Sequence, residues 1–261
     1  MDILKKIVDD KRLEVKLRKQ LIPIEQLERS VLFERQCHSL SKRLKESTSG
    51  IIAEHKRRSP SKQVINHDLN VFDVAKGYEN AGVCGMSVLT DGKYFGGSLD
   101  DLLTARSICN LPLLRKEFII DAYQIIEAKA YGADVILLIA AILTTKEINQ
   151  LSRLAKTVGL EVLLEIHNED ELQKSIMPSL DLLGVNNRNL KTFEVSLETS
   201  KQLSELIPND FVKVSESGMS STAAIKQLQP YGYQGFLIGE NFMKTKDAGE
   251  SAKQFIKDLN R

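Results

Sequence analysis

The chain has 261 residues, and its 36 lysines and arginines against 35 aspartates and glutamates leave a net charge of only +1. This balance gives no general attraction to nucleic acid or to an anionic membrane, so neither is expected as a partner. The longest apolar run, residues 135–143, is shorter than the ~20 residues of a membrane span, and charges interrupt the first ten residues where a secretory signal would be apolar. The sequence predicts a cytoplasmic protein.

Residues 1–48 are expected to form a helical extension of two or three helices. Apolar residues recur at helical spacing on both sides of Pro23, which interrupts the pattern. They are Ile3, Leu4, Ile7 and Val8 before it, and Ile24, Leu27, Val31 and Leu32 after it. We expect this extension to pack across one end of the domain that follows.

From residue 50 onward, short apolar runs alternate with amphipathic stretches. The runs are residues 51–54, 86–90, 111–116, 135–140, 161–166, 182–187, 211–217 and 235–240. Apolar strands separated by helices indicate a parallel sheet covered by helices, and eight such units favour a closed (β/α)₈ TIM barrel. An open doubly wound sheet is the alternative fold. No linker divides the chain, so residues 1–261 are predicted to form a single domain.

Several predicted helices carry start or stop signals. Pairs spaced like capping boxes are Ser98 with Asp101, Thr144 with Glu147, and Asn168 with Glu171. Gly132 and Gly159 stand where helices should end before the next strand. These signals support the alternation of strand and helix.

Polar side chains end most of the predicted strands. They are Glu54 and Lys56, Lys116, Glu165, Asn186 and Arg188, Glu216 and Ser217, and Gly239 and Glu240. The carboxyl ends of barrel strands meet at one face, so these groups would converge there and perturb one another's pKa values. The alternative interpretation is a set of solvated loops that bind nothing.

The turns after the last two strands indicate a phosphate site. Ser217-Gly218 and Gly239 are small residues that let backbone amides approach a ligand, and barrels often bind phosphate between these two loops. Each glycine alone could equally be an ordinary turn. Cysteines and histidines are scattered without ligand spacing, so no metal site is expected.

Seven segments together resemble the successive signatures of the indole-3-glycerol-phosphate synthase family. They are IIAEHKRRSPSK, SVLTDGKYFGGSLDDL, LPLLRKEFIIDAYQIIEAKAYGADVILLI, GLEVLLEIHNEDEL, LGVNNRNLKTF, VSESGM and GFLIGENFMK. They occur in the family's order over residues 50 to 245, and the helical extension is also similar to that family's. The resemblance implies a carboxy-lyase of tryptophan biosynthesis that needs no cofactor and no metal.

The implied reaction closes the pyrrole ring of 1-(2-carboxyphenylamino)-1-deoxyribulose 5-phosphate, with loss of carbon dioxide and water, to give indole-3-glycerol phosphate. By resemblance, Lys116 is the general acid toward the ketone or its hydroxyl, and Glu165 belongs to the proton-transfer chain. Glu54 and Lys56 match a pair that orients the site and assists ring closure or dehydration. The catalytic set is completed by Asn186, Glu216 and Ser217.

The resemblance also gives a substrate-binding set. It comprises Ser59, Phe118, Leu137, Arg188, Gly218, Leu237, Gly239 and Glu240. Phe118 and Leu137 match walls around the aromatic ring, while the choice of anion held by Lys56, Ser59 or Arg188 stays open. His55 lies between two site residues and should point the other way, as a packing residue, because side chains alternate along a strand.

Two other functions are alternatives to the one that this resemblance implies. A different phosphate-binding barrel, such as a sugar-phosphate isomerase, would leave the strand-end charges of Glu54, Lys56, Lys116 and Glu165 unexplained. A catalytically silent barrel that serves as a scaffold would be expected to have lost one of them. The partner is therefore predicted to be a phosphorylated small molecule, and the chain to be a monomer, with a dimer as the alternative.

Overall fold

The computed structural model describes residues 3–60, 62–190 and 192–261. Its strands are β1 (Ile51–His55), β2 (Gly85–Leu89), β3 (Leu113–Lys116), β4 (Val135–Ile139), β5 (Glu161–Ile166), β6 (Leu182–Asn186), β7 (Val212–Glu216) and β8 (Tyr233–Ile238). The helices before and between the first strands are α1 (Ile3–Leu21), α2 (Ile24–Glu28), α3 (Leu40–Glu46), α4 (Val71–Ala81), α5 (Gly92–Phe95), α6 (Leu99–Ile108) and α7 (Ala122–Ala130). The later ones are η1 (Ala140–Ile142), α8 (Thr145–Thr157), α9 (Glu169–Ser175), α10 (Glu198–Ser204), α11 (Thr222–Leu228), η2 (Gln229–Tyr231), α12 (Glu240–Met243) and α13 (Ala248–Leu259).

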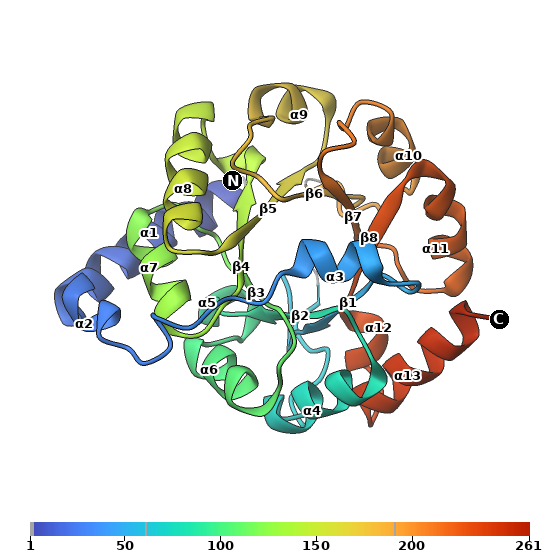
Figure 1. The fold of residues 1–261 in the computed structure, drawn as a ribbon, viewed down its shortest axis with the longest axis horizontal. Helices are drawn as coiled ribbons and strands as arrows, with labels where there is room; N and C mark the ends of the chain where they lie inside the picture. The colour runs from blue at the N-terminus through green and yellow to red at the C-terminus, as the bar shows by residue number, and fades with distance from the viewer. Residues whose placement is uncertain (1–2, 61, 191) are drawn as a thin grey trace.

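The strands close into a barrel in chain order, with β1 paired in parallel to both β2 and β8. Figure 1 shows the strands at the centre and the longer helices in a ring around them. The strands are almost continuously apolar and buried because helices cover their outer face while their own side chains fill the interior. The predicted (β/α)₈ barrel is therefore confirmed, and the open sheet is wrong.

Helix boundaries follow the predicted signals with one difference. Thr144 and Glu147 form a complete capping box, whereas Ser98 and Asn168 each accept one amide hydrogen without the reciprocal bond. Gly132 and Gly159 have φ of 86° and 80° and lie two residues beyond the last residues of α7 and α8. This left-handed conformation is the one that favours glycine at a helix end.

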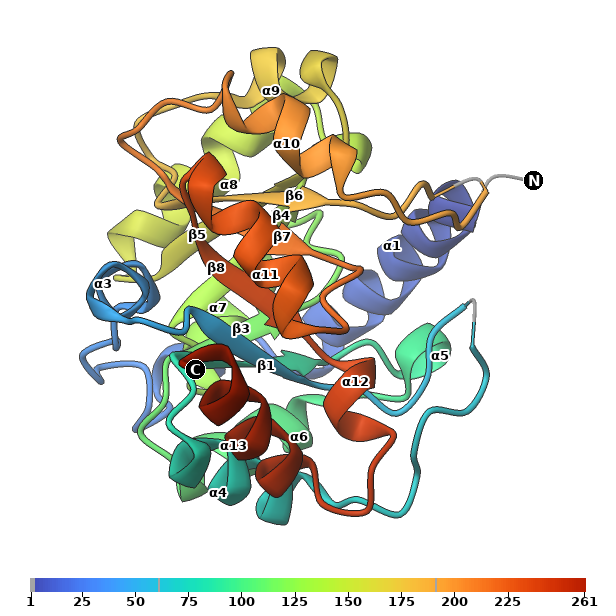
Figure 2. The same cartoon turned by 90° about the vertical axis from the view of Figure 1, so that its right-hand side faces the viewer.

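The N-terminal extension reaches both ends of the barrel, so the expectation of one end was incomplete. Helix α3 lies over the amino end, where Leu40 and Leu44 pack into the barrel and Glu161 of β5 accepts hydrogen bonds from Ser39 and Ser41. The first turn of α1 instead lies near the carboxyl end. Figure 2 shows α3 at one end of the molecule and α5, α12 and the start of α1 at the other.

The rest of α1 packs along the outside of the barrel. Val15 contacts the cluster that contains Tyr123 and Ile126 of α7, and Arg18 Nε pairs with Glu127 at 2.5 Å. A helix of 19 residues is long enough to run from one end of the barrel to the other. The apolar spacing of its residues predicts that the helix packs on the barrel, but not at which end. None of the helices in the described part of the chain is both long and apolar enough to cross a membrane.

Candidate active site

A cavity of about 380 Å³ opens at the carboxyl end of the barrel. All fifteen residues predicted for the site line it. They are Glu54, Lys56, Ser59, Lys116, Phe118, Leu137, Glu165, Asn186, Arg188, Glu216, Ser217, Gly218, Leu237, Gly239 and Glu240. The volume lies in the range of pockets that enclose a small organic ligand.

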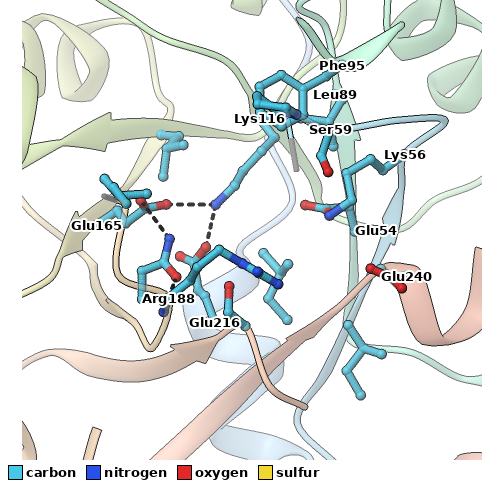
Figure 3. A pocket seen from close by; sticks show the side chains of 18 of the residues that line it. Glu54, Lys56, Ser59, Leu89, Phe95, Lys116, Glu165, Arg188, Glu216 and Glu240 are labelled. Carbon is cyan, nitrogen blue, oxygen red and sulfur yellow. Dashed lines mark hydrogen bonds and ion pairs between the residues drawn. The ribbon is translucent and has the colours of Figure 1, made fainter. Parts of the chain in front are cut away.

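Lys116, the last residue of β3, is the centre of the cavity's polar wall. Its Nζ donates to Glu165 Oε2 at 3.0 Å and to Glu216 Oε2, so two other strands supply its partners. Asn186 Nδ2 at the end of β6 donates to Glu165 Oε1 at 3.1 Å. Figure 3 shows Lys116 extending toward the two carboxylates across the cavity. Barrel closure thus assembles one hydrogen-bonded network from four strand ends.

Burial and mutual charge shift the pKa values of this network. Burial alone would lower the pKa of Lys116, but the carboxylates of Glu216 and Glu165 raise it above its ordinary value. Burial would raise the pKa of Glu165, yet the nearby Lys116 and His167 hold it below its ordinary value. Burial and the neighbouring Glu165 and Glu54 raise the pKa of Glu216 to about 7, against the effect of Lys116. Its Oε1 is buried and has no hydrogen-bond partner among the described atoms.

Glu54 and Lys56 form an ion pair on the opposite wall, with Lys56 Nζ 2.7 Å from Glu54 Oε1. A side chain at Gly239 could not coexist with it, because a Cβ there would lie 2.6 Å from the same oxygen. Gly239 therefore makes room for Glu54. His55 between them is buried and does not line the cavity, as predicted, and burial with Arg57 lowers its pKa to about 4.

The loop after β7 has an unusual backbone. Ser217 and Gly218 both have positive φ, 64° and 82°, and a serine rarely adopts such a conformation unless its surroundings enforce it. The buried Asn187 does so: its Nδ2 donates to the carbonyls of Glu216 and Ser217 at 3.1 Å, and its Oδ1 accepts from Ser200. The turn holds Ser217 and Gly218 against the cavity.

The loop after β8 passes directly into α12, so Gly239 and Glu240 form a helix start rather than the end of a strand. The carboxylate of Glu240 pairs with Lys62 at 2.6 Å across the mouth, and this contact lowers its pKa. Its negative charge disfavours a phosphate contact by the side chain, which leaves only its backbone amide for that purpose. Lys244 also lines the cavity beside this loop.

Another part of the cavity lining is apolar. Phe118 and Leu137 lie in its wall, and the ring of Phe95 packs against Phe118 with centroids 5.9 Å apart. Ile3 and Ile7 of α1 complete this wall. The resulting slot suits an aromatic ring, while the charged wall suits polar substituents.

Sequence reasoning missed part of the lining. Besides residues already described, it comprises Leu4, Pro60, Leu89, Glu117, Ile139, Leu190, Phe193, Met219, Ser220, Ile238 and Asn241. Phe95 and Lys244 lie inside segments that carried the resemblance, and the apolar pattern of α1 was recognised but was assigned only to packing. Within residues 3–60, 62–190 and 192–261, no group of three His, Cys, Asp or Glu side chains could hold a metal ion.

Fold and site together define a (β/α)₈ barrel with a charged cavity at the carboxyl ends of its strands, the arrangement of a barrel enzyme. A family model described as Indole-3-glycerol phosphate synthase matches residues 4–255. An indole-3-glycerol phosphate synthase of Bacteroides thetaiotaomicron is 48% identical over 258 residues, which cover 99% of each chain. One of Campylobacter jejuni is 40% identical over 258 residues, 97% of this chain and 100% of the relative. The chain belongs to the indole-3-glycerol phosphate synthase family.

Solved structures of low sequence identity are similar to this chain in fold alone. The 3-hexulose-6-phosphate synthase of Salmonella typhimurium has a TM-score of 0.65 at 12% identity, over 81% of this chain and 98% of that one. The tryptophan synthase complex of Pyrococcus furiosus has a TM-score of 0.59 at 16% identity, over 81% and 97%.

Three predictions from the sequence are thereby confirmed. The chain is an indole-3-glycerol-phosphate synthase by family, a carboxy-lyase of tryptophan biosynthesis that acts on a phosphorylated small molecule, and its fold is the (β/α)₈ barrel. The scaffold and isomerase alternatives do not agree with these relatives.

Proposed function

We propose that the cavity binds 1-(2-carboxyphenylamino)-1-deoxyribulose 5-phosphate and that Lys116 is the general acid of its ring closure. The observation that carries this proposal is the position of Lys116 Nζ, fixed in the cavity between Glu165 and Glu216. Ring closure requires a proton on the ketone oxygen as the aromatic carbon attacks the carbonyl carbon. A positioned ammonium group supplies that proton and stabilises the developing charge.

The later steps need a second proton and a base. Loss of carbon dioxide leaves its bonding electrons in the ring and restores aromaticity. Loss of water then requires one proton on the departing hydroxyl and removal of one proton from the adjacent carbon. Glu165 is our candidate for the base, because Lys116 keeps it ionised, and Lys56 with Glu54 is our candidate for assisting dehydration.

The remaining predicted catalytic residues support these groups. Asn186 donates to Glu165 and fixes its orientation. Glu216 accepts from Lys116, and its pKa near neutrality suits a group that returns a proton to the lysine between steps. Ser217 has a strained backbone in the cavity wall, which we interpret as a device for aiming its amide or hydroxyl at the substrate.

Different parts of the cavity bind the aromatic ring and the phosphate of the substrate. We assign the aromatic ring to the slot of Phe118, Leu137 and Leu237, and the phosphate to the loops after β7 and β8 around Gly218 and Gly239. Amide donors to a charged oxygen contribute about 1.5–3 kcal/mol each. Cationic side chains in the cavity lining then neutralise the phosphate and the carboxylate of the substrate. They are Lys56, Arg188 and Lys244, and Ser59 is a further hydrogen-bond donor.

We also propose that residues 1–261 act as one domain, with the extension of residues 1–48 forming part of the cavity. The contacts of Ile3 and Ile7 with the cavity and of α3 with the amino end support this view. The monomer remains our expectation, because every group in the proposed mechanism belongs to one barrel. The cytoplasm remains the predicted location, since a phosphorylated intermediate is retained in the compartment where it is made.

The fluorescence of indole formed from the synthetic ribulose phosphate tests the proposal. We expect turnover by the purified chain, and competitive inhibition by inorganic phosphate that weakens in Lys244→Met but not in Lys226→Met, a lysine on α11 outside the cavity lining. Phosphate bound elsewhere in a soaked crystal, with both loops empty, would contradict the assignment of the phosphate site. Gly239→Val is unsuitable as a probe because its side chain would displace Glu54.

A further inference from the structure

His167 lies one residue beyond β5, behind Glu165 and outside the lining of the cavity. Its side chain is only 12% exposed, and its Nε2 is 3.4 Å from Glu165 Oε1. This nitrogen is buried and makes no hydrogen bond within the part of the chain that the structure describes. A buried polar atom aimed at a carboxylate of the proposed mechanism calls for a functional explanation.

Glu171 in the first turn of α9 fixes the other side of the imidazole. Its Oε2 accepts from the backbone amide of His167 at 2.8 Å and lies 3.2 Å from Nδ1. Asn168 holds Glu171 in turn, accepting from its amide at 2.9 Å and donating to Oε1 at 3.1 Å. An ionised carboxylate can only accept hydrogen bonds, so Nδ1 carries a hydrogen.

With the hydrogen on Nδ1, the charge of the imidazole decides whether a proton lies between Nε2 of His167 and Oε1 of Glu165. If the imidazole were neutral, the lone pair of Nε2 would face the lone pairs of an ionised Oε1, and the contact would be repulsive. The contact is favourable only when a proton lies on one of the two atoms. The groups that act on the imidazole are Glu171, Glu165 and, farther away, Glu216, all of them carboxylates. Although burial would lower the pKa of His167, these carboxylates raise it.

We propose that His167 is a positioning residue that holds a proton against Glu165, and that this positive neighbour keeps the carboxylate ionised and fixed for proton transfer. The inference rests on the role given above to Glu165. It adds a second cation to the one already described, because Lys116 contacts Oε2 of the same carboxylate while His167 faces Oε1. Glu165 is thereby held from both oxygens, with Glu171 as the outer anchor.

The test compares the pH dependence of kcat and of KM, from about pH 3 to about pH 9, among variants of the full chain, because the lowered pKa of Glu165 places its limb below about pH 5. His167→Gln keeps a hydrogen-bond donor but removes the charge, and His167→Leu removes both. With the positive neighbour gone, the pKa of Glu165 should rise, so the acidic limb of kcat should move upward by about one pH unit in both variants. KM should stay within about threefold of the parent's, because His167 does not line the cavity.

Three further variants make the result decisive. Glu171→Gln should shift the limb in the same direction by less, since it removes the anion that fixes Nδ1, and it replaces His167→Gln if that variant fails to fold. His38→Gln, at an exposed histidine next to α3 at the other end of the barrel, should leave the profile unchanged. A His167→Gln profile that overlays the parent's would overturn the inference alone. Full activity in Glu165→Gln would instead refute the role of Glu165, and the inference with it.

Discussion

At the scale of single residues, the site is a set of charges whose states depend on one another. Lys116 satisfies two buried carboxylates that would otherwise repel, and they in turn keep the lysine protonated in a place where burial alone would favour its neutral form. Lys116 can act as an acid, and its carboxylate partners can act as bases, because the fold holds them in contact. The same contacts therefore stabilise the fold and set the protonation states on which the proposed reaction depends.

Lys116→Met should lower kcat by about 10²–10⁴-fold, the usual contribution of a positioned general acid. KM should change much less, because the slot and the phosphate loops are untouched. Single-turnover measurements would separate the chemical step from product release. A variant whose chemical step kept at least a third of the parent's rate, with an unchanged fold by circular dichroism, would show that Lys116 is not the acid.

Glu216 should make the folded state less stable as the pH rises from about 4.5 to about 7. Its pKa is about 7 in the folded chain against an ordinary value of 4.5, so the folded state retains a proton that the unfolded state loses in this interval. The stabilisation is complete below about pH 4.5 and is lost by the time the pH passes about 7. A difference of this size corresponds to about 3 kcal/mol.

Urea unfolding of the parent and of Glu216→Gln between about pH 5 and about pH 8 measures this effect. Glutamine cannot ionise, so the stability of the variant relative to the parent should increase with pH across the interval. Glu165 does not disturb the comparison, since its lowered pKa places its own contribution at more acidic pH. Parallel stability curves for the two proteins would contradict the assignment.

At the scale of elements, α1 is attached to the strand ends by a buried lysine. Lys11 is 2% exposed, and its Nζ lies 2.9 Å from Asp91 Oδ2 and 3.1 Å from Glu117 Oε1. Asp91 precedes α5, and Glu117 directly follows Lys116, so one side chain connects the extension to two loops of the site. Glu117 also accepts from the amide of Phe118 at 2.8 Å, which links the same network to the apolar slot.

Lys11→Met should destabilise the folded chain by about 3–5 kcal/mol, because it leaves Asp91 and Glu117 buried without their common cation. Chemical denaturation checks this value. Lys5→Met on the same helix is the matched control: its ion pair with Asp9 is exposed, and the midpoint of denaturation should not move. Equal midpoints for the two variants would mean that the Lys11 network contributes nothing to folding.

The sequence predicted elements and strand ends well because both depend on short-range pattern. Continuous apolar runs determine buried strands, and the carboxyl end of each strand is known once its direction is known. Contacts between elements far apart in the chain were not predictable: nothing near Lys11 indicates Asp91, and nothing near His167 shows that its Nε2 faces Glu165. The space that Gly239 leaves for Glu54 likewise depends on how β8 and β1 pack together.

At the scale of the whole molecule, the exposed surface of α1 bears on the oligomeric state. Leu13, Leu17 and Leu21 are spaced one turn apart and are 63%, 59% and 77% exposed. A stable dimer usually buries about 1,200–2,000 Å² in total, far more than a stripe of three leucines supplies. The exposed charged residues Glu14, Lys16 and Lys19 flank the stripe, a composition typical of a solvated helix face.

We therefore expect the chain to be a monomer of 29.3 kDa in solution. Light scattering coupled to size exclusion, at low and high protein concentration, measures the mass directly. Specific activity should be independent of protein concentration, because the proposed catalytic groups belong to one barrel. Leu17→Glu should change neither the mass nor kcat. A doubled mass that Leu17→Glu returns to the single-chain value would show instead that the stripe is a dimer interface, and the monomer prediction would be wrong.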